Sequence, residues 1–534
     1  MKQPRNLHPF LLPILPVLFL YAYNNQELSL ADLWGPLALT LAGAGMLWGL
    51  LALVLRDRGR AGLLTSLFCL WFFSWSRLYS LVPDSYDAPS IRSCFTIYLL
   101  LIAGAAGFII YQKRGRNTLT VALNLMALGL VALQLTSIGR FELRRSLTAA
   151  KIKPATEVKL AATSPTAQFP NIYFIVLDGY ARADTLQQIY HYDNRPFLQA
   201  LAQRGFQVIP QSRANYGQTP FSIASTLNFK YLDQLAREVG TDSSDRMPLT
   251  TMIQNSRLFS ILRKQHYQIS TFPSGYTMIE LHEPEVHVFK PKGKTIPVEF
   301  DTLLLKTTVT ALFVNMTPSR REPTLSPWLR PLYTFDHLQE ANQLTPPFFV
   351  YAHILLPHPP FIFDRNGELL VHPIKGRVHG TYKGIDLAHN DAGKFPGTRE
   401  EYINGYREQL IYTNNCTLKA LDRVLASSHR PTLIVLISDH GPASQFVKAE
   451  QGNPRGMKER FANFISYRLP DGGTLTAADE LSSVNIFRLV LNRYFNTQLQ
   501  LLPDKSYASS WEKPYLFTDV TAIATGRAKD SRRK

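Results

Sequence analysis

Cysteine is scarce in this chain of 534 residues, which contains only Cys69, Cys94 and Cys416. The first two lie in a strongly apolar N-terminal region, so only Cys416 belongs to the more polar remainder. A framework of disulfide bonds is therefore excluded for that remainder. The scarcity does not exclude an oxidising compartment, because a domain of this size can bury enough apolar surface without disulfides.

The sequence also lacks any known nucleic-acid-binding module, although its formal net charge is +17. The basic residues are scattered along the chain, so we expect no nucleic acid partner. Two interpretations of the positive charge stay open. It belongs to basic loops and solvated faces, or it attracts anionic lipids or a phosphorylated substrate.

Five apolar segments occupy residues 1–140, and most approach the ~20 residues that cross a bilayer as a helix. They are Phe10–Tyr23, Leu33–Leu55, Leu63–Val82, Phe95–Tyr111 and Leu119–Ile138. The first is short and contains Pro13 and Pro16, so a signal peptide is the alternative interpretation. No small-residue cleavage site follows it, which favours an uncleaved span. We therefore predict a transmembrane domain of five spans.

Basic residues in the short loops predict how these spans are oriented. They precede the first span and follow the second and the fourth: Lys2, Arg5, Arg56, Arg58, Arg60, Lys113, Arg114 and Arg116. The positive-inside rule then places the N-terminus in the cytoplasm and, after five crossings, the rest of the chain outside the cytoplasmic membrane. Arg140, Arg144 and Arg145 on the outer side oppose this assignment, but the rule is weaker before a long translocated domain.

Beyond the spans, we predict a linker over residues 141–170, a catalytic domain over 171–505 and a basic tail over 506–534. Strand and helix patterns alternate in the large domain, which favours an α/β/α sandwich with a mostly parallel central sheet. The predicted strands are Ile172–Leu177, Gln207–Ile209, Tyr267–Thr271, Phe348–Ile354, Thr432–Ser438 and Phe461–Arg468. The predicted helices are Arg195–Arg204, Pro220–Asn228, Arg257–Gln265, Arg399–Ser427 and Val484–Tyr494.

Acidic residues and a histidine follow two of these strands. The stretch TLIVLISDHGP, residues 432–442, ends a buried strand with Asp439 and His440, and Asp178 follows the strand Ile172–Leu177. Open α/β sheets bind their ligands at such strand ends. Two carboxylates and an imidazole suit Zn²⁺ or Mn²⁺, with Mg²⁺ as a further candidate. We predict one divalent metal ion at Asp178, Asp439 and His440, although each stretch alone would be read as a turn or a core histidine.

A hydroxyl group that could act at this site is offered by Thr219. It precedes Pro220, a residue favoured in the first turn of a helix, so Thr219 is expected at the helix N-cap. The simplest interpretation is that Thr219 only caps the helix. The functional one is that a hydroxyl at this position, in contact with a divalent cation, loses its proton and becomes a nucleophile. Ser222, Ser225 and Thr226 are alternatives further along the helix.

Two histidines belong to the strand Phe348–Ile354 and the loop after it. His353 lies inside the apolar strand, and His358 lies in the rigid run Pro-His-Pro-Pro. Either could bind a phosphate oxygen or protonate a leaving alkoxide. For His353, a buried structural histidine is the simpler interpretation.

These motifs together resemble the alkaline phosphatase superfamily. Asp178 after a strand, Thr219 at a helix start, His358 before Pro359 and the run Asp439-His440-Gly441 are similar to its sulfatase-like membrane branch. That branch contains the lipoteichoic acid synthases and the lipid A phosphoethanolamine transferases, which also place five spans before an extracytoplasmic domain. The resemblance covers the whole layout, with motifs from about Asn171 to Tyr494.

The resemblance implies that Asp178, Asp439 and His440 bind the metal, and that Thr219 is both the fourth ligand and the nucleophile. It implies that His358, and less directly His353, bind the substrate phosphate. Three features depart from the family pattern. Asp178 stands where the membrane transferases usually have Glu, the formylglycine signature of true sulfatases is absent, and the disulfides of the phosphoethanolamine transferases cannot form.

Three functions are compatible with these features. The first is a membrane-anchored transferase that moves a phospho-alcohol group from a phospholipid donor, through a phosphothreonine, to a glycan or lipid acceptor of the cell envelope. The second is a sulfatase-like hydrolase or phosphodiesterase that uses the same site with water as acceptor. The third is a catalytically inactive sulfatase-like binding domain, which is the weakest candidate because all four predicted metal-site positions carry suitable residues.

Overall fold

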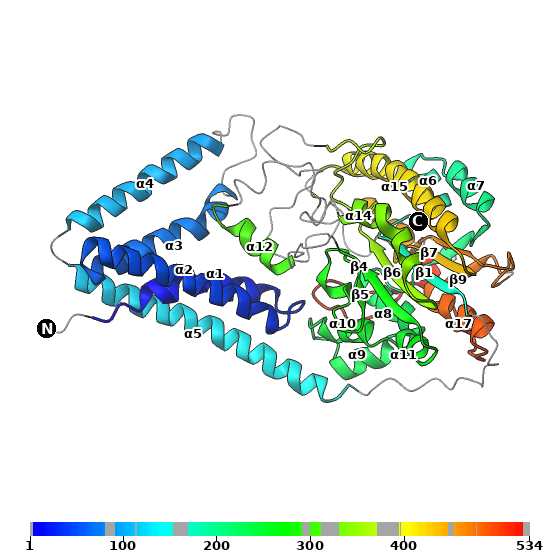
Figure 1. Cartoon of the computed structure of the whole chain (residues 1–534), viewed down its shortest axis with the longest axis horizontal. Coiled ribbons are helices and arrows are strands. Elements are labelled where there is room, and N and C mark those ends of the chain that lie inside the picture. The colour runs from blue at the N-terminus through cyan, green and yellow to red at the C-terminus, as the bar shows by residue number, and fades with distance from the viewer. Residues whose placement is uncertain are drawn as a thin grey trace, which may run out of the picture.

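The computed structural model describes residues 4–80, 91–112, 115–152, 169–290, 299–310, 330–370, 395, 397–446, 453–476 and 478–526. Two parts are evident in Figure 1, a group of long N-terminal helices and an α/β domain that follows them. The predicted order of a helical N-terminal region before an α/β sandwich is therefore confirmed.

The described residues of all five predicted apolar segments form helices: α1 (His8–Asn24), α2 (Ala31–Leu55), α3 (Arg58–Ser80), α4 (Ile91–Tyr111) and α5 (Arg116–Ala149). Residues 81 and 82 of the third predicted segment lie outside the described part. Among the described residues, only α2, α4 from Ser93 onward and α5 are long and apolar enough to cross a membrane. The predicted count of five spans is therefore wrong by this criterion. Helix α1 has 17 residues and contains two prolines, and α3 begins with Arg58 and Arg60.

Large apolar side chains cover the outside of the three long helices. Leu39, Leu53, Leu100 and Leu133 are each at least 66% exposed: 77%, 76%, 67% and 66%. Such a surface is unfavourable in water but not against lipid tails. The N-terminal region is therefore a membrane anchor.

Helix α5 continues beyond the predicted linker start and reaches the α/β domain. It ends at Ala149, so residues 141–149 of the predicted linker 141–170 are helical, and residues 153–168 lie outside the described part. Near its end, the Arg145 guanidinium forms two hydrogen bonds with the Asp245 carboxylate, from Nε and Nη2, each of 3.0 Å. The two parts are also joined by a backbone hydrogen bond of 2.8 Å from Arg246 N to Gln26 O.

The central sheet of the α/β domain has seven strands in the order β2-β8-β7-β1-β6-β4-β5. Their bounds are β1 (Asn171–Leu177), β2 (Phe206–Val208), β4 (Gln268–Phe272), β5 (His287–Val288), β6 (Phe348–Ile354), β7 (Thr432–Ile437) and β8 (Ile465–Arg468). Strand β1 pairs in parallel with both β6 and β7, while β8 is antiparallel to β7 and β2. The parallel strands β7, β1 and β6 therefore end at one edge, side by side.

Every residue of β1 is buried, because helices cover both faces of the sheet. Phe174 and Val176 pack into one apolar core and Tyr173 and Ile175 into the other, as alternation along a strand requires. The first core includes residues of α8 (Thr219–Asn228), α9 (Asp233–Val239), α10 (Met247–Gln254), α11 (Arg257–Lys264) and α17 (Ser483–Tyr494). The second includes residues of α6 (Ala183–Tyr190), α7 (Arg195–Gln203), α14 (Arg330–His337) and α15 (Arg399–Ser427).

Within residues 171–534, two predicted segments differ from the structure by more than one residue at an end. The predicted strand Phe461–Arg468 begins only at Ile465, because residues Pro454–Phe461 form helix α16, whose N-cap Asn453 accepts a hydrogen bond from Arg455 N. Residues 506–526 of the predicted tail are folded onto the α/β domain. They form β10 (Tyr507–Ala508), β11 (Thr518–Asp519) and α18 (Thr521–Ala524), with Tyr515 and Val520 buried, whereas residues 527–534 lie outside the described part.

Among the described residues, three other elements complete the set of α-helices and β-strands. Strands β3 (Gln211–Arg213) and β9 (Glu480–Ser482) pair in parallel beside the main sheet. Helix α12 (Glu299–Thr307) lies between the two parts in Figure 1. Its residues Phe300 and Leu303 belong to the same buried apolar cluster as Val17 and Leu18 of α1, so α12 packs on the helical part.

Candidate active site

Asp178 follows β1 directly and is 3% exposed. Its Oδ2 lies 3.2 Å from His353 Nε2, while among the described residues no hydrogen-bond donor reaches the buried Oδ1. Burial alone would raise the pKa of this carboxyl group, but His358, His353 and His440 together hold the pKa well below its usual range. Asp178 is therefore an ionised carboxylate with one oxygen bound and one available.

The turn after Asp178 depends on Gly179, whose φ of +68° is unfavourable for residues with a side chain. A Cβ at this position would also lie 3.4 Å from His358 Cδ2. The Gly179 N–H donates a hydrogen bond of 3.1 Å to Asp439 Oδ1. The turn therefore connects the ends of β1 and β7.

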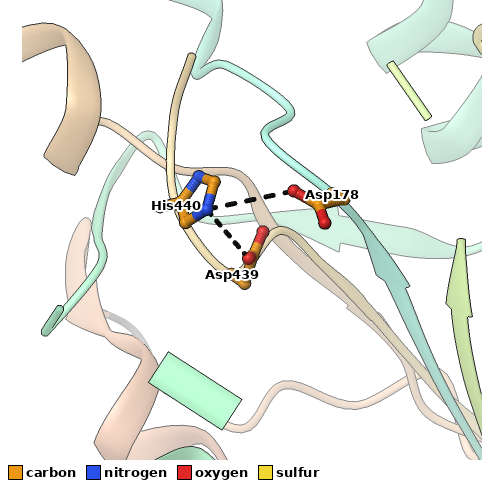
Figure 2. Close-up of side chains that lie close together, drawn as sticks. All are labelled: Asp178, Asp439 and His440. Atoms are coloured by element: carbon orange, nitrogen blue, oxygen red, sulfur yellow. Dashed lines mark ion pairs between the residues drawn. The ribbon is translucent and has the colours of Figure 1, made fainter. Parts of the chain in front are cut away.

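Asp439 and His440 follow β7 and are both 0% exposed. The Asp439 carboxylate repeats the arrangement of Asp178, because Oδ1 accepts from Gly179 N while Oδ2 is buried with no hydrogen-bond donor among the described residues. Figure 2 shows both carboxylates facing the His440 imidazole. His440 Nε2 lies 3.1 Å from Asp439 Oδ2 and 3.9 Å from Asp178 Oδ1.

The His440 imidazole is neutral, since burial and the nearby Arg460 charge lower its pKa to about 4. Its Nδ1 lies 2.9 Å from the Gly441 carbonyl, which can only accept, so Nδ1 carries the proton. His440 Nε2 therefore presents a lone pair to the site. The next residue must be glycine, because a Cβ on Gly441 would lie 2.2 Å from the Glu459 carbonyl oxygen.

Thr219 brings the predicted hydroxyl to the same point. Its Oγ1 lies 3.1 Å from His440 Nε2, and Thr219 is 8% exposed. The expected N-cap position was wrong by one residue: Gln218 has the extended backbone of the N-cap, and Thr219 is the first residue of α8. Its hydroxyl still lies at the positive end of the helix.

The alternative hydroxyls on α8 are directed elsewhere. Ser222 Oγ donates to the Asp439 carbonyl oxygen at 2.6 Å, and Ser225 Oγ donates to the Lys230 carbonyl oxygen at 2.8 Å. Thr226 is 1% exposed and lies about two helical turns beyond Thr219. Thr219 is thus the hydroxyl of this helix that meets His440.

The two predicted substrate histidines differ in position. His353 is 2% exposed, and because its Nε2 contacts Asp178 Oδ2, its place behind the carboxylate does not favour direct contact with a substrate. His358 is half-buried, and its ring centroid lies 6.2 Å from that of His440. His358 Nδ1 lies 2.8 Å from the Pro359 carbonyl oxygen and so donates to it, which leaves the opposite ring edge for other partners.

Arg460 is a site residue that the sequence analysis missed. Its Nη2 lies 3.0 Å from His440 Nε2, and its Nε donates a hydrogen bond of 2.7 Å to the Gly217 carbonyl oxygen. An arginine at the end of an amphipathic segment carries no motif, and the sequence predicted a strand only from Phe461, directly after Arg460. Its contact with the site arises only because α16 ends beside the loop after β7.

These side chains suit a divalent cation. One ligand atom each from Asp178, Asp439 and His440 lies within 4.8 Å of the other two, and all three residues are buried. The two carboxylate oxygens without hydrogen-bond donors and the imidazole lone pair are ligands that Zn²⁺ and Mn²⁺ accept. The Thr219 hydroxyl next to them would be a fourth ligand.

Comparison with known families agrees with the fold of the α/β domain. A family model described as Sulfatase matches residues 170–517. The chain belongs to the sulfatase family. The match extends past residue 505, so for this sulfatase-family protein the folded residues 506–517 are part of the family domain.

Two solved structures resemble this sulfatase-family protein at low identity. The C-terminal periplasmic domain of EcEptC from Escherichia coli, in complex with Zn, has 12% identity and a TM-score of 0.43, covering 69% of this chain and 96% of that one. The integral membrane lipooligosaccharide phosphoethanolamine transferase A from Neisseria meningitidis has 15% identity and a TM-score of 0.41, covering 92% and 96%. A search among curated protein sequences found no match.

Proposed function

We propose that this protein is a metal-dependent phosphotransferase of the sulfatase family, anchored in the cytoplasmic membrane with its α/β domain outside the cytoplasm. It transfers a phospho-alcohol group, such as phosphoethanolamine or phosphoglycerol, from a phospholipid to a glycan or lipid of the envelope. One observation carries this proposal: Thr219 Oγ1, His440 Nε2 and two carboxylate oxygens without hydrogen-bond donors meet at one point.

The cation supplied to this point would help Thr219 lose its hydroxyl proton and would offset the negative charge on the phosphoryl oxygens. Asp178, Asp439 and His440 are the residues that would hold it, with Thr219 Oγ1 beside them. The neutral His440 suits this role, because a protonated imidazole could not offer Nε2 as a ligand.

In the first half of the reaction, Thr219 Oγ1 attacks the phosphorus of the donor phosphodiester and its proton passes to water. The bond from phosphorus to the lipid alcohol breaks, and His358 donates a proton to the departing alkoxide. In the second half, an acceptor hydroxyl attacks the phosphothreonine and gives its proton to His358, which restores that residue. The bond from phosphorus to Oγ1 breaks, and Thr219 takes a proton from water. The membrane anchor keeps the α/β domain near a lipid donor.

Replacing the nucleophile tests the proposal. The full-length protein in detergent is incubated with phosphatidylethanolamine or phosphatidylglycerol labelled in the phosphate, and both diacylglycerol release and label on the protein are measured. Thr219→Ala should lower diacylglycerol release by at least about 100-fold and abolish the protein label. Ser225→Ala, which removes a hydroxyl from the same helix, is the control and should retain both diacylglycerol release and the label on the protein.

Undiminished diacylglycerol release by Thr219→Ala would remove this mechanism. Withholding the acceptor distinguishes the hydrolase alternative from the proposed transferase. Release that continues unchanged when every hydroxyl acceptor except water is withheld would favour a phosphodiesterase over a transferase.

A further inference from the structure

The guanidinium group of Arg460 lies between the loop that leads into Thr219 and the loop that carries His440. Its Nε donates to the Gly217 carbonyl oxygen at 2.7 Å, and its Nη1 donates to the Gly441 carbonyl oxygen at 3.2 Å. Gly217 lies two residues before Thr219, and Gly441 directly follows His440. The two carbonyls hold the positive charge at the site.

The remaining nitrogen, Nη2, faces the lone pair that a metal ion would need. It lies 3.0 Å from His440 Nε2 and must donate to it, because Nδ1 carries the imidazole proton. A single in-plane lone pair on Nε2 cannot accept a proton donor and coordinate a cation at the same time. Arg460 and the metal ion therefore compete for His440.

Binding of a cation leaves Arg460 in an unfavourable position. The contacts of Nε and Nη1 are with carbonyl oxygens and not with His440 Nε2, so the guanidinium stays close while Nη2 loses its acceptor. A guanidinium beside a divalent cation is repelled, and this repulsion is strong in a site where His440 and Asp439 are 0% exposed. An anion that contacts both positive groups removes the repulsion and supplies Nη2 with an acceptor.

We propose that Arg460 couples occupancy of the metal site to binding of a tetrahedral phosphoryl group, so that each strengthens the other. The proposal rests on the metal site of the proposed function and names Arg460 as the residue that contacts a phosphoryl oxygen through Nη2. Lysine cannot replace it, because one ammonium group cannot keep two carbonyl oxygens and a phosphoryl oxygen in the geometry of a guanidinium fork.

Metal binding measured with and without inorganic phosphate tests this coupling. The affinity of the detergent-solubilised full-length protein for Zn²⁺ is determined by competition with a metal-sensitive dye, in the absence and presence of orthophosphate. In the wild type, orthophosphate should tighten Zn²⁺ binding by about tenfold or more, within the usual range of coupling between sites. Reciprocity requires Zn²⁺ to tighten phosphate binding by the same factor.

The variants isolate the contribution of Arg460. Arg460→Ala should bind Zn²⁺ alone several-fold more tightly than the wild type, since the competitor is gone, and should lose most of the phosphate effect. Arg460→Lys should also lose most of that effect. Arg455→Ala removes an exposed arginine from the same helix and should behave as the wild type.

An unchanged phosphate effect in Arg460→Ala would overturn the proposal, as would a wild-type affinity for Zn²⁺ that does not respond to phosphate. The wild-type measurement keeps the test decisive if Arg460→Ala does not fold. If phosphate does not tighten Zn²⁺ binding but Thr219→Ala still abolishes transfer, the coupling is wrong and the proposed transfer reaction stands. If phosphate does tighten Zn²⁺ binding but Thr219→Ala still releases diacylglycerol, only the transfer mechanism is wrong.

Discussion

His353 fixes which oxygen of Asp178 is available. His353 Nε2 lies 3.2 Å from Asp178 Oδ2, and because an ionised carboxylate only accepts, Nε2 donates to it. The proton on Nε2 leaves His353 Nδ1 as the acceptor that the Tyr351 hydroxyl meets at 3.3 Å. Asp178 Oδ1 is then directed to the point where His440 and Thr219 meet.

Removing this orienting contact should weaken metal binding. We expect His353→Leu to lower the affinity for Zn²⁺ by about 10–100-fold, the usual effect of losing the partner of a metal ligand. His353→Gln can still donate a hydrogen bond to Asp178, so its affinity for Zn²⁺ should fall by less. Tyr351→Phe removes only the more distant hydroxyl and should have the smallest effect. Zn²⁺ binding by His353→Leu that equals the wild type would show that Asp178 needs no such partner.

Gly441 should not tolerate a methyl group. A Cβ there would lie 2.2 Å from the Glu459 carbonyl oxygen and 3.0 Å from that of Ala462, so the backbone after His440 would have to move. We expect Gly441→Ala to lower the melting temperature by several degrees and to abolish Zn²⁺ binding. Gly139→Ala, on a membrane helix with nothing within 4 Å of the new methyl group, is the control. Normal Zn²⁺ affinity in Gly441→Ala would contradict this account.

The membrane helix α5 should stabilise the α/β domain through its ion pair. Arg145 and Asp245 have side chains that are 14% and 6% exposed. Removing one partner of a fully buried pair typically costs about 3–5 kcal/mol, which is an upper bound for this partly buried pair. Asp245→Asn and Arg145→Gln should therefore each lower the melting temperature of the full-length protein. The double variant should lower it by less than the sum of the two single decreases. The exposed Arg144→Gln is the matched control. Additive losses in the double variant would mean that the pair is not coupled.

Glu459 should make stability depend on pH. Burial raises the pKa of its carboxyl group above 4.5, against hydrogen bonds from Tyr190, Ser444 and Gln445 that lower it. The folded protein then keeps this proton to a higher pH than the unfolded chain does, so stability falls as pH rises from 4.5 through the raised pKa. Melting temperatures measured across pH should show this fall in the wild type and not in Glu459→Gln.

Glu408 is the control, because its contribution to stability should change with pH in the opposite direction. Its hydrogen bond with Arg365 lowers the pKa of its carboxyl group, so its contribution is present at neutral pH and is lost as pH falls. The stability difference between the wild type and Glu408→Gln should therefore shrink on acidification. If the two variants respond to pH with the same sign, the assignment for Glu459 is wrong.

Regular patterns in the sequence predicted most of the fold. The bounds of β6 and α15 are those expected, because a continuous apolar run and a capping box at Thr398 and Glu401 mark them locally. The error at α16 has the opposite cause, since Arg455, Lys458 and Arg460 make its apolar pattern weak. Residues 506–526 looked like a tail because their few apolar residues, such as Tyr515 and Val520, find partners only in other parts of the fold.

The sequence by itself determined the membrane anchor, the mostly parallel sheet and the placement of Asp178, Asp439 and His440 at strand ends, because these follow from local hydrophobic patterns and from the geometry of parallel strands. Only the tertiary structure decided that His353 lies behind Asp178 and that Arg460 meets His440. Such contacts join segments that are 175 and 20 residues apart, and no local pattern specifies which side chain will stand beside another when the strands and helices pack.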